Sequence, residues 1–523
     1  MRTVGRVFVR SRRFLGLWLA MLWVAGLGAA GSDVRLLDAV KKSDHAAIRS
    51  LLHQRADANA ADVDQTTALH WAVQRDDLES TRALIHAGAN VKAANRYGVT
   101  ALTLACINGS TAIIAALFEG GADANTALPE GETVLMTASR TGKVEPLQLL
   151  LARGATVNVK ENWRGQTALM WAVAERHPAA ARLLLDHGAD VGARSKGGLT
   201  ALLFAVRAGD LESLRLLLDR RADVHDTASD GTSALTLAII NARFDVALVL
   251  LDSGANPNAA DPRGSALHAL AFMRNPGYPF QVGVLPAPHG DSLEVAKSML
   301  AHGAHPNVRI DWKEGPFDRD YGMVKTPPNI AIGRNYMSLI GATPFYVAAK
   351  GGDVSLMRVL VAAGADPRLP TKQNVTPLMV AAGLGFWDGE SPGPESGVPE
   401  SQSLEAVALA LEWGIDINAV ADYGDTPPEN DGVALLRRHF QDLSGAIGDM
   451  RWSGSTALHG AALRGANSIV RFLVEKGARL DARNKVGWTP LMIADGIFVS
   501  NTEKTQTSTA SLLRQLMAEK GIP

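Results

Sequence analysis

Residues 389–393 of this 523-residue chain read G-E-S-P-G and match the G-x-S-x-G pattern that presents a nucleophilic serine for acyl transfer. That chemistry needs a β-strand before the serine and a helix after it, so that the hydroxyl is exposed on a tight turn. A helical pattern precedes Ser391 and a proline-rich stretch follows it. The match is therefore interpreted as accidental.

Histidine and cysteine side chains are the other candidates for chemistry. His302 and His305, with His289 nearby in the sequence, are of the type that binds metal ions. His302 belongs to a common H-G-A sequence and His305 begins the turn after it, so both are interpreted as structural. Cys106 stands where alanine is usual and is expected to be packed rather than reactive. The sequence has no phosphate-binding loop, H-E-x-x-H motif or dinucleotide fingerprint, so we expect no catalytic residue, cofactor or metal.

Composition limits the class of protein and of partner. The chain is 47% hydrophobic and 20% charged, which is enough to bury a core, and its formal net charge is -1. A balanced charge without a long basic run argues against nucleic acid as the main partner. The single cysteine leaves no internal disulfide, so packing alone must hold the fold.

The first thirty residues have the pattern of a secretory signal peptide. Five arginines begin it, an apolar run extends from Phe14 to Ala25, and small residues follow up to Ala30. We expect cleavage after Ala30, which would leave a periplasmic or secreted chain with no membrane span. The apolar run is short for a transmembrane helix, but an uncleaved membrane anchor stays open as the alternative.

One pattern of two short apolar helices, a glycine and a polar turn recurs along most of the chain. Each copy starts at a threonine or serine, and the spacings in the first run are 33, 33, 34, 33, 33 and 32 residues. A fixed period of this length predicts a solenoid of stacked helix pairs. The starting residues are Thr67, Thr100, Thr133, Thr167, Thr200, Ser233 and Ser265, then Thr343 and Thr376, then Thr456 and Thr489.

Each copy has the residues that a helix–turn–helix unit needs. The hydroxyl suits the N-terminus of a first helix, where backbone N–H groups lack partners. Small residues such as Ala72 and Ala105 let neighbouring helices approach closely. A leucine-rich second helix ends at a glycine, which adopts the left-handed conformation at little cost. Arg55 and Arg221 stand at this glycine position in two copies.

The sequences TALHWA, TPLMVAA, TALHGAA and SGANPNAAD resemble the ankyrin repeat, whose core is T-P-L-H-x-A-A followed by L-L-x-x-G-A-D-x-N. GATPFYVAAKGGD and GWTPLMIADG also resemble a group of exported bacterial ankyrin proteins. The resemblance implies an all-α ankyrin-repeat solenoid with β-turn fingers and a concave groove, and binding rather than catalysis. It also implies that His70, His268 and His459 tie adjacent fingers by hydrogen bonds.

The repeat starts predict the order of parts along the chain, with a cap at each end and insertions confined to the C-terminal half. The predicted parts are a signal peptide (1–30), an N-terminal capping repeat (31–66), six regular repeats (67–264), repeats with insertions (265–455; insertions 274–290, 309–341 and 384–402), a degenerate repeat (426–455), and a final repeat with a C-terminal cap (456–523).

The interruptions are rich in Pro, Trp and Tyr and all fall after residue 273. Insertions in solenoids often lie on the binding face, so we hypothesise that these segments complete one recognition surface. Residues 384–402 hold four acids and no base, and a solvated, mobile loop is the alternative for that segment.

Aromatic side chains are the candidate partner-binding residues, because Trp and Tyr dominate binding hot spots. Ankyrin geometry implies that the residue after the motif histidine lies on the inner face of the groove, although packing between repeats is the alternative for these side chains. The candidates are Trp71, Trp171 and Phe204 on the inner face, Tyr97, Trp163 and Tyr423 at finger tips, and Trp312 and Trp387 in the insertions.

Two functions remain open from the sequence. The first is a non-catalytic, exported scaffold that presents the groove to a protein or peptide partner. The alternative is an enzyme or small-ligand-binding protein whose site is formed by the C-terminal insertions. A titratable group with a shifted pKa in a closed pocket would favour the second.

Export makes a prediction about the N-terminus. If the signal is cleaved as expected, chain recovered from native cells should have an intact mass that begins at Gly31. A recovered chain that still begins at Met1 would instead favour the membrane anchor.

Overall fold

The computed structural model of the chain divides into two compact blocks, and the boundary lies between Asp230 and Gly231. Ala30, Trp312, Trp387 and Tyr423 lie outside the residues that the structure describes. The described residues are 34–259, 264–274, 290–311, 317–318, 323–324, 339–385, 398–422, 453–497 and 505–523.

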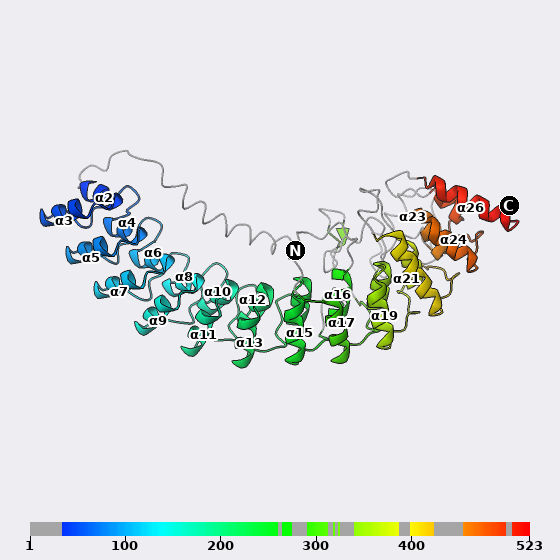
Figure 1. Cartoon of the computed structure of the whole chain (residues 1–523), viewed down its shortest axis with the longest axis horizontal. Coiled ribbons are helices and arrows are strands. Elements are labelled where there is room, and N and C mark those ends of the chain that lie inside the picture. Colours follow the sequence, from blue (N-terminus) through cyan, green and yellow to red (C-terminus); the bar gives the residue numbers. More distant parts are fainter. Residues whose placement is uncertain are drawn as a thin grey trace. The chain divides into compact units, whose positions relative to one another are not determined.

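The N-terminal block consists of helix pairs in which each first helix packs on the first helices of its neighbours, and each second helix on the second helices. Figure 1 shows the two rows, with α4, α6, α8, α10 and α12 in one and α5, α7, α9, α11 and α13 in the other. The helices are α2 (Val34–Lys41), α3 (His45–His53), α4 (Ala68–Gln74), α5 (Leu78–His86), α6 (Ala101–Asn108), α7 (Thr111–Glu119), α8 (Val134–Thr141), α9 (Val144–Ala152), α10 (Ala168–Ala174), α11 (Pro178–Asp186), α12 (Ala201–Ala208) and α13 (Leu211–Asp219).

The first helices start where the sequence places them. Thr67, Thr100, Thr133, Thr167 and Thr200 are the N-caps of α4, α6, α8, α10 and α12, and each side chain accepts a hydrogen bond from the backbone N–H three residues on. Such a cap contributes about 1 kcal/mol of helix stability. Several second helices use aspartate instead, as Asp77 does for α5.

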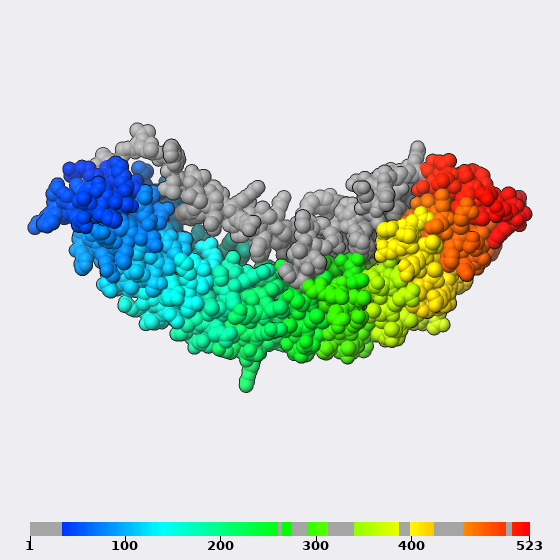
Figure 2. Space-filling model, viewed as in Figure 1, coloured from blue at the N-terminus to red at the C-terminus, as the bar shows by residue number. Residues whose placement is uncertain are grey.

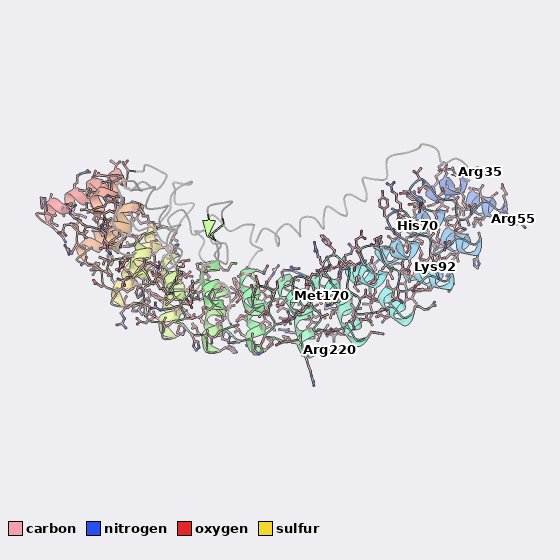
Figure 3. All side chains as sticks on the ribbon, turned by 180° about the vertical axis from the view of Figure 1, so that it is seen from behind. Arg35, Arg55, His70, Lys92, Met170 and Arg220 are labelled. Carbon is pink, nitrogen blue, oxygen red and sulfur yellow. The ribbon has the colours of Figure 1, made fainter. Side chains whose placement is uncertain are left out.

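The core of the N-terminal block lies between the two rows. Alanines such as Ala72, Ala138 and Ala205 are fully buried in the first helices, and leucines such as Leu84 and Leu150 are fully buried in the second helices. Figure 2 shows that side chains fill the spaces between the ribbons of successive repeats. In Figure 3, His70 and Met170 belong to the row of first helices, whereas Arg55 and Arg220 lie at the ends of second helices.

The C-terminal block has the same two rows. The first helices are α14, α16, α18, α20, α23 and α25, and the second helices are α15, α17, α19, α21, α24 and α26. The block also holds a two-residue β-hairpin, β1 (Phe317–Asp318) paired antiparallel with β2 (Met323–Val324), so the described chain is helical apart from this hairpin. The helices are α14 (Ala234–Ile240), α15 (Phe244–Asp252), α16 (Ala266–Arg274), α17 (Ser292–Ala301), α18 (Pro344–Lys350), α19 (Val354–Ala362), α20 (Pro377–Ala382), α21 (Glu400–Glu412), α23 (Ala457–Arg464), α24 (Asn467–Glu475), α25 (Pro490–Ala494) and α26 (Thr507–Glu519).

The insertion expected at 309–341 opens within a finger, the turn that joins one repeat to the next. In the regular finger at 95–99, the Asn95 N–H donates to the Val99 carbonyl over 2.9 Å. Ile310 and Ala342 make the same bond over 2.9 Å. The base of the finger is therefore kept on both sides of the insertion.

Residues 423–452, which make up most of the stretch expected as a degenerate repeat (426–455), lie outside the described part. Helix α23 packs on α20, and α24 packs on α21, so these two repeats are direct neighbours. The Ala421 N–H donates to the Ser455 carbonyl over 2.9 Å, which closes a finger base like the one at 95–99. The described helix pairs on the two sides of this stretch therefore contact each other directly, and the degenerate repeat itself stays a prediction.

Asparagine side chains bridge successive repeats. In the N-terminal block, Asn125 Nδ2 donates to the Gly154 carbonyl over 3.2 Å, and Asn125 Oδ1 accepts from the Thr156 N–H over 2.8 Å. In the C-terminal block, Asn307 makes the same two bonds, to Gly364 over 3.0 Å and from Asp366 over 2.7 Å. Four more asparagines bridge successive repeats with the same pair of hydrogen bonds: Asn59, Asn158, Asn258 and Asn418.

The helix-closing position makes a prediction about stability. Arg55 and Arg221 have φ of 61° and 64°, in the left-handed region that glycines occupy elsewhere, and that conformation costs a residue with a Cβ about 1 kcal/mol. Arg55→Gly and Arg221→Gly should each raise the denaturant midpoint slightly, because greater freedom of the unfolded chain offsets part of the gain.

Gly88 supplies the matched control for these two variants. It has a φ of 88°, and a Cβ added there would meet no atom within 4 Å. Gly88→Ala should therefore lower the midpoint through backbone strain alone. A clear loss of stability in both arginine variants would contradict the prediction.

Candidate protein-binding surface

The first helices and the fingers beside them form one face of each block, called here the first-helix face. In the N-terminal block a row of side chains, each four residues after a helix N-cap, lies along it. Trp71, Leu104 and Trp171 are half-buried, whereas Thr137 and Phe204 are buried. Phe204 is only 2% exposed, so a partner would contact the side chains that cover this ring rather than the ring itself.

A cation covers each aromatic ring of the row. Lys41 Nζ lies 4.7 Å from the centroid of the Trp71 ring, and Arg140 Cζ lies 5.5 Å from that of Trp171. Arg207 Cζ lies 4.8 Å from the Phe204 centroid. Cation–π contacts of this kind are attractive and orient the cation over the ring.

These cations were not among the residues singled out from the sequence. The signal for one of them was present, because Arg207 follows Phe204 by three residues and therefore lies on the same side of α12. The contact of Arg140 with Trp171 joins two different repeats, so no spacing within one helix indicates it.

Lys41 and Arg140 each have a carboxylate beside them. Asp62 accepts a hydrogen bond from Trp71 Nε1 over 3.3 Å and lies 3.6 Å from Lys41 Nζ. Glu132 lies 3.9 Å from the guanidinium of Arg140. The chain thus supplies its own counter-charge at Trp71 and at Trp171.

Two finger tips carry exposed aromatic rings. Tyr97 is 37% exposed, and Trp163 is 69% exposed. Each ring is covered by the arginine beside it in sequence, with Arg96 Cζ 4.8 Å from the Tyr97 centroid and Arg164 Cζ 4.2 Å from the Trp163 centroid. The predicted tip positions of Tyr97 and Trp163 agree with the structure.

Glu161 fixes the turn that presents Trp163. Its side chain is 5% exposed and accepts hydrogen bonds from the N–H groups of Trp163, Arg164 and Gln166 over 2.6, 2.9 and 2.8 Å. Backbone ordered in this way lets an exposed ring meet a partner with little further loss of conformational entropy.

The residues weighed for chemistry have packing roles where the structure describes them. Cys106 is fully buried, and burial raises the pKa of its thiol well above its ordinary value. His302 Nδ1 donates to the Ser298 carbonyl over 2.8 Å. Among the described residues, no group of three or more His, Cys, Asp or Glu side chains could hold a metal ion. His289 and residues 389–393 lie outside the described part.

The motif histidines connect each repeat to the next finger. Nε2 of His70, His268 and His459 lies 3.0, 3.0 and 3.1 Å from a carbonyl of the following finger. Nδ1 of each ring lies within 2.9 Å of the Thr or Ser hydroxyl at its own helix start. Burial lowers the pKa of all three rings, to about 4 for His268 and for His459.

In the C-terminal block the chain itself covers one position of the first-helix face. Gly460 occupies the row position in α23, four residues after the N-cap Thr456. A Cβ on Gly460 would lie 2.3 Å from the backbone nitrogen of Leu384, so only glycine fits there. Gly383 and Leu384, directly after α20, therefore lie against the first-helix face of the next repeat.

Comparison with known families decides what these repeats are. A profile of three ankyrin repeats matches residues 36–127, 117–195, 192–261 and 433–496, and a profile of one ankyrin repeat matches residues 340–372. Together these matches cover more than half of the chain. The chain belongs to the ankyrin repeat family.

Individual relatives match only part of this ankyrin chain. The B-cell lymphoma 3 protein of Homo sapiens is 36% identical over 177 residues, which are 29% of this chain and 39% of the relative. Its homolog of Mus musculus is 34% identical over 245 residues, which are 36% of this chain and 54% of that relative. The chain therefore covers less than two thirds of either relative.

Solved ankyrin structures are also similar to part of the chain. The human ASB11 ankyrin repeat domain is 27% identical with a TM-score of 0.39, over 42% of this chain and 98% of that one. The ankyrin repeat domain of Bcl-3 is 30% identical with a TM-score of 0.37, over 41% and 97%. Ankyrin repeat proteins are in general binding scaffolds rather than enzymes. The structure also contains no helix, among the described residues, that is long and apolar enough to cross a membrane.

The buried histidines predict a pH dependence. The folded pKa of about 4 for His268 and His459 lies below the ordinary 6.5, so the unfolded chain takes up protons first as the pH falls. The stability that each neutral ring contributes is fully present above about pH 6.5 and is lost towards pH 4, and the loss is on the order of 3 kcal/mol per ring.

A denaturant titration at several pH values tests this. His268→Asn with His459→Asn should lower the midpoint at pH 7 but flatten its decline towards pH 4.5, whereas His86→Asn, at an exposed position, should change neither. An equal decline in the double variant and the unchanged chain would contradict the prediction.

Proposed function

We propose that this chain is an exported, non-catalytic ankyrin scaffold that holds a protein or peptide partner on its first-helix face and finger tips. One observation carries the proposal most directly: Trp163 is 69% exposed on a turn that Glu161 holds rigid. An exposed aromatic ring on a rigid turn contributes little to packing, whereas such rings dominate binding hot spots. The half-buried Trp71 and Trp171 extend the surface along the same block.

Export and cellular location are part of the proposal. The arginine-rich start, the short apolar run and the small residues up to Ala30 support secretion to a periplasm or out of the cell. The single thiol suits an oxidising compartment, because Cys106 is fully buried and out of contact with other thiols. We expect a protein or peptide partner, and neither nucleic acid nor a membrane.

The insertions extend the same surface in this proposal. The described residues beside them are the finger bases at Ile310 and Ala421, and Leu384, which lies against Gly460 on the first-helix face. Trp312, Trp387 and Tyr423 would then join the described aromatic rings as anchors. The enzymatic alternative gains no support, since the histidines and the cysteine with lowered or raised pKa values are engaged in packing.

Capture of a partner from the exported fraction of native cells, read by mass spectrometry, tests the function. Trp312→Ala with Trp387→Ala should reduce capture strongly, because a buried aromatic anchor contributes about 2 kcal/mol, while thermal unfolding should hardly change. Trp163→Ala is tested in parallel. Loss of the partner in that variant alone would exclude the insertions, and a chain that captures no protein would contradict the scaffold proposal.

A further inference from the structure

The tips of the first four fingers each carry an exposed apolar side chain. Val63, at the first tip, is 73% exposed, and Trp163, at the fourth, is 69% exposed. The next finger reads S-K-G-G at 195–198 and has no apolar side chain at its tip. Single exposed apolar residues are common on proteins, whereas a contiguous set of them marks an interaction site. The four side chains, called here the tip row, are Val63, Tyr97, Pro129 and Trp163.

Backbone contacts hold the tips of these fingers in place. Within a finger one hydrogen bond closes the turn, as from the Gly98 N–H to the Asn95 carbonyl over 2.9 Å. Between fingers, the Asn162 N–H donates to the Glu130 carbonyl over 2.7 Å. The ring of Pro129 packs against Gly98, where an added Cβ would clash with it. The tip row therefore meets a partner with little further loss of conformational entropy.

Positive charge surrounds the C-terminal end of the tip row. Arg164 lies over the ring of Trp163, and Lys196 Nζ donates to the carbonyl of the residue directly before Trp163. Within the described part of the chain, neither Arg164 nor Lys196 forms an ion pair. Glu161 turns inward to accept backbone N–H groups, and the exposed Glu130 is paired with neither cation. A carboxylate from a partner would thus meet two cations beside the exposed ring.

The spacing of the tips fits an extended chain. Packed helices lie about 8–10 Å apart, so successive fingers follow one another at about that distance. A polyproline II segment rises about 3.1 Å per residue with three residues per turn, so every third side chain faces the same side about 9 Å further on. A β-strand repeats its side-chain direction after about 6.6 Å, which does not match the fingers.

We propose that the tip row binds an extended polyproline II segment of the partner protein, with proline or an apolar residue at every third position and a carboxylate beside Trp163. This inference rests on the proposed function and names the shape and chemistry of its partner. Tyr97 and Trp163 supply aromatic surfaces of the kind on which proline-rich segments dock. Arg164 supplies a planar guanidinium that matches a carboxylate, and Lys196 supplies a second positive charge.

Selection of random peptides on phage by the immobilised full chain tests this inference. The selected peptides should carry proline or apolar residues at every third position and Asp or Glu at one end. Trp163→Ala and Tyr97→Ala should each weaken their binding about tenfold or more, because aromatic anchors dominate binding energy. Arg164→Glu should also weaken it, and Arg164→Lys should weaken it less, because lysine keeps the charge without the planar fork. Thermal unfolding should stay unchanged in all four variants, since the tips are exposed.

Ile107→Ala is the matched control, since Ile107 is 47% exposed on α6 of the same block but lies outside the tip row, and it should leave binding unchanged. Equal loss in this variant would show general apolar attraction and overturn the inference. Peptides with apolar residues three and four apart would indicate a helical partner and overturn it too. Binding that survives Trp163→Ala and Tyr97→Ala would overturn it and leave the scaffold function standing.

A chain that selects no peptide would also overturn the inference. Capture of a partner from native cells by the same chain would then still support the scaffold function, and failure of that capture as well would contradict both.

Discussion

The junction between successive repeats is the contact on which the structure depends, and an asparagine bridge marks it. Asn125 and Asn307 each donate to the carbonyl that closes one second helix and accept from the N–H that follows it in the next repeat. A repeat cannot bury its apolar face alone, so the stability of each one depends on this junction with its neighbours. Because the junction involves neighbouring repeats only, changes elsewhere along the chain leave it intact.

This locality explains where the chain tolerates added residues. Finger bases at Ile310 and Ala421 keep the hydrogen bond of a regular finger, although many more residues separate the two bonded positions. The finger that carries Trp163 shows a smaller case: its base bond joins Glu161 to Gln166, one residue farther apart than Asn95 and Val99. Finger tips therefore vary without cost to the stack, and variation there changes what the protein presents to a partner.

The sequence predicted the parts of the fold that one repeat determines by itself. The hydroxyl at Thr100 and the left-handed glycine at Gly88 act within a few residues, so spacing alone located the helix ends. The repeat at 426–455 stays a prediction, because a segment of nearly repeat length has the same sequence pattern whether it stacks as a repeat or extends a finger. The cation–ring contacts were missed for a related reason: Arg140 meets Trp171 only after two repeats have stacked.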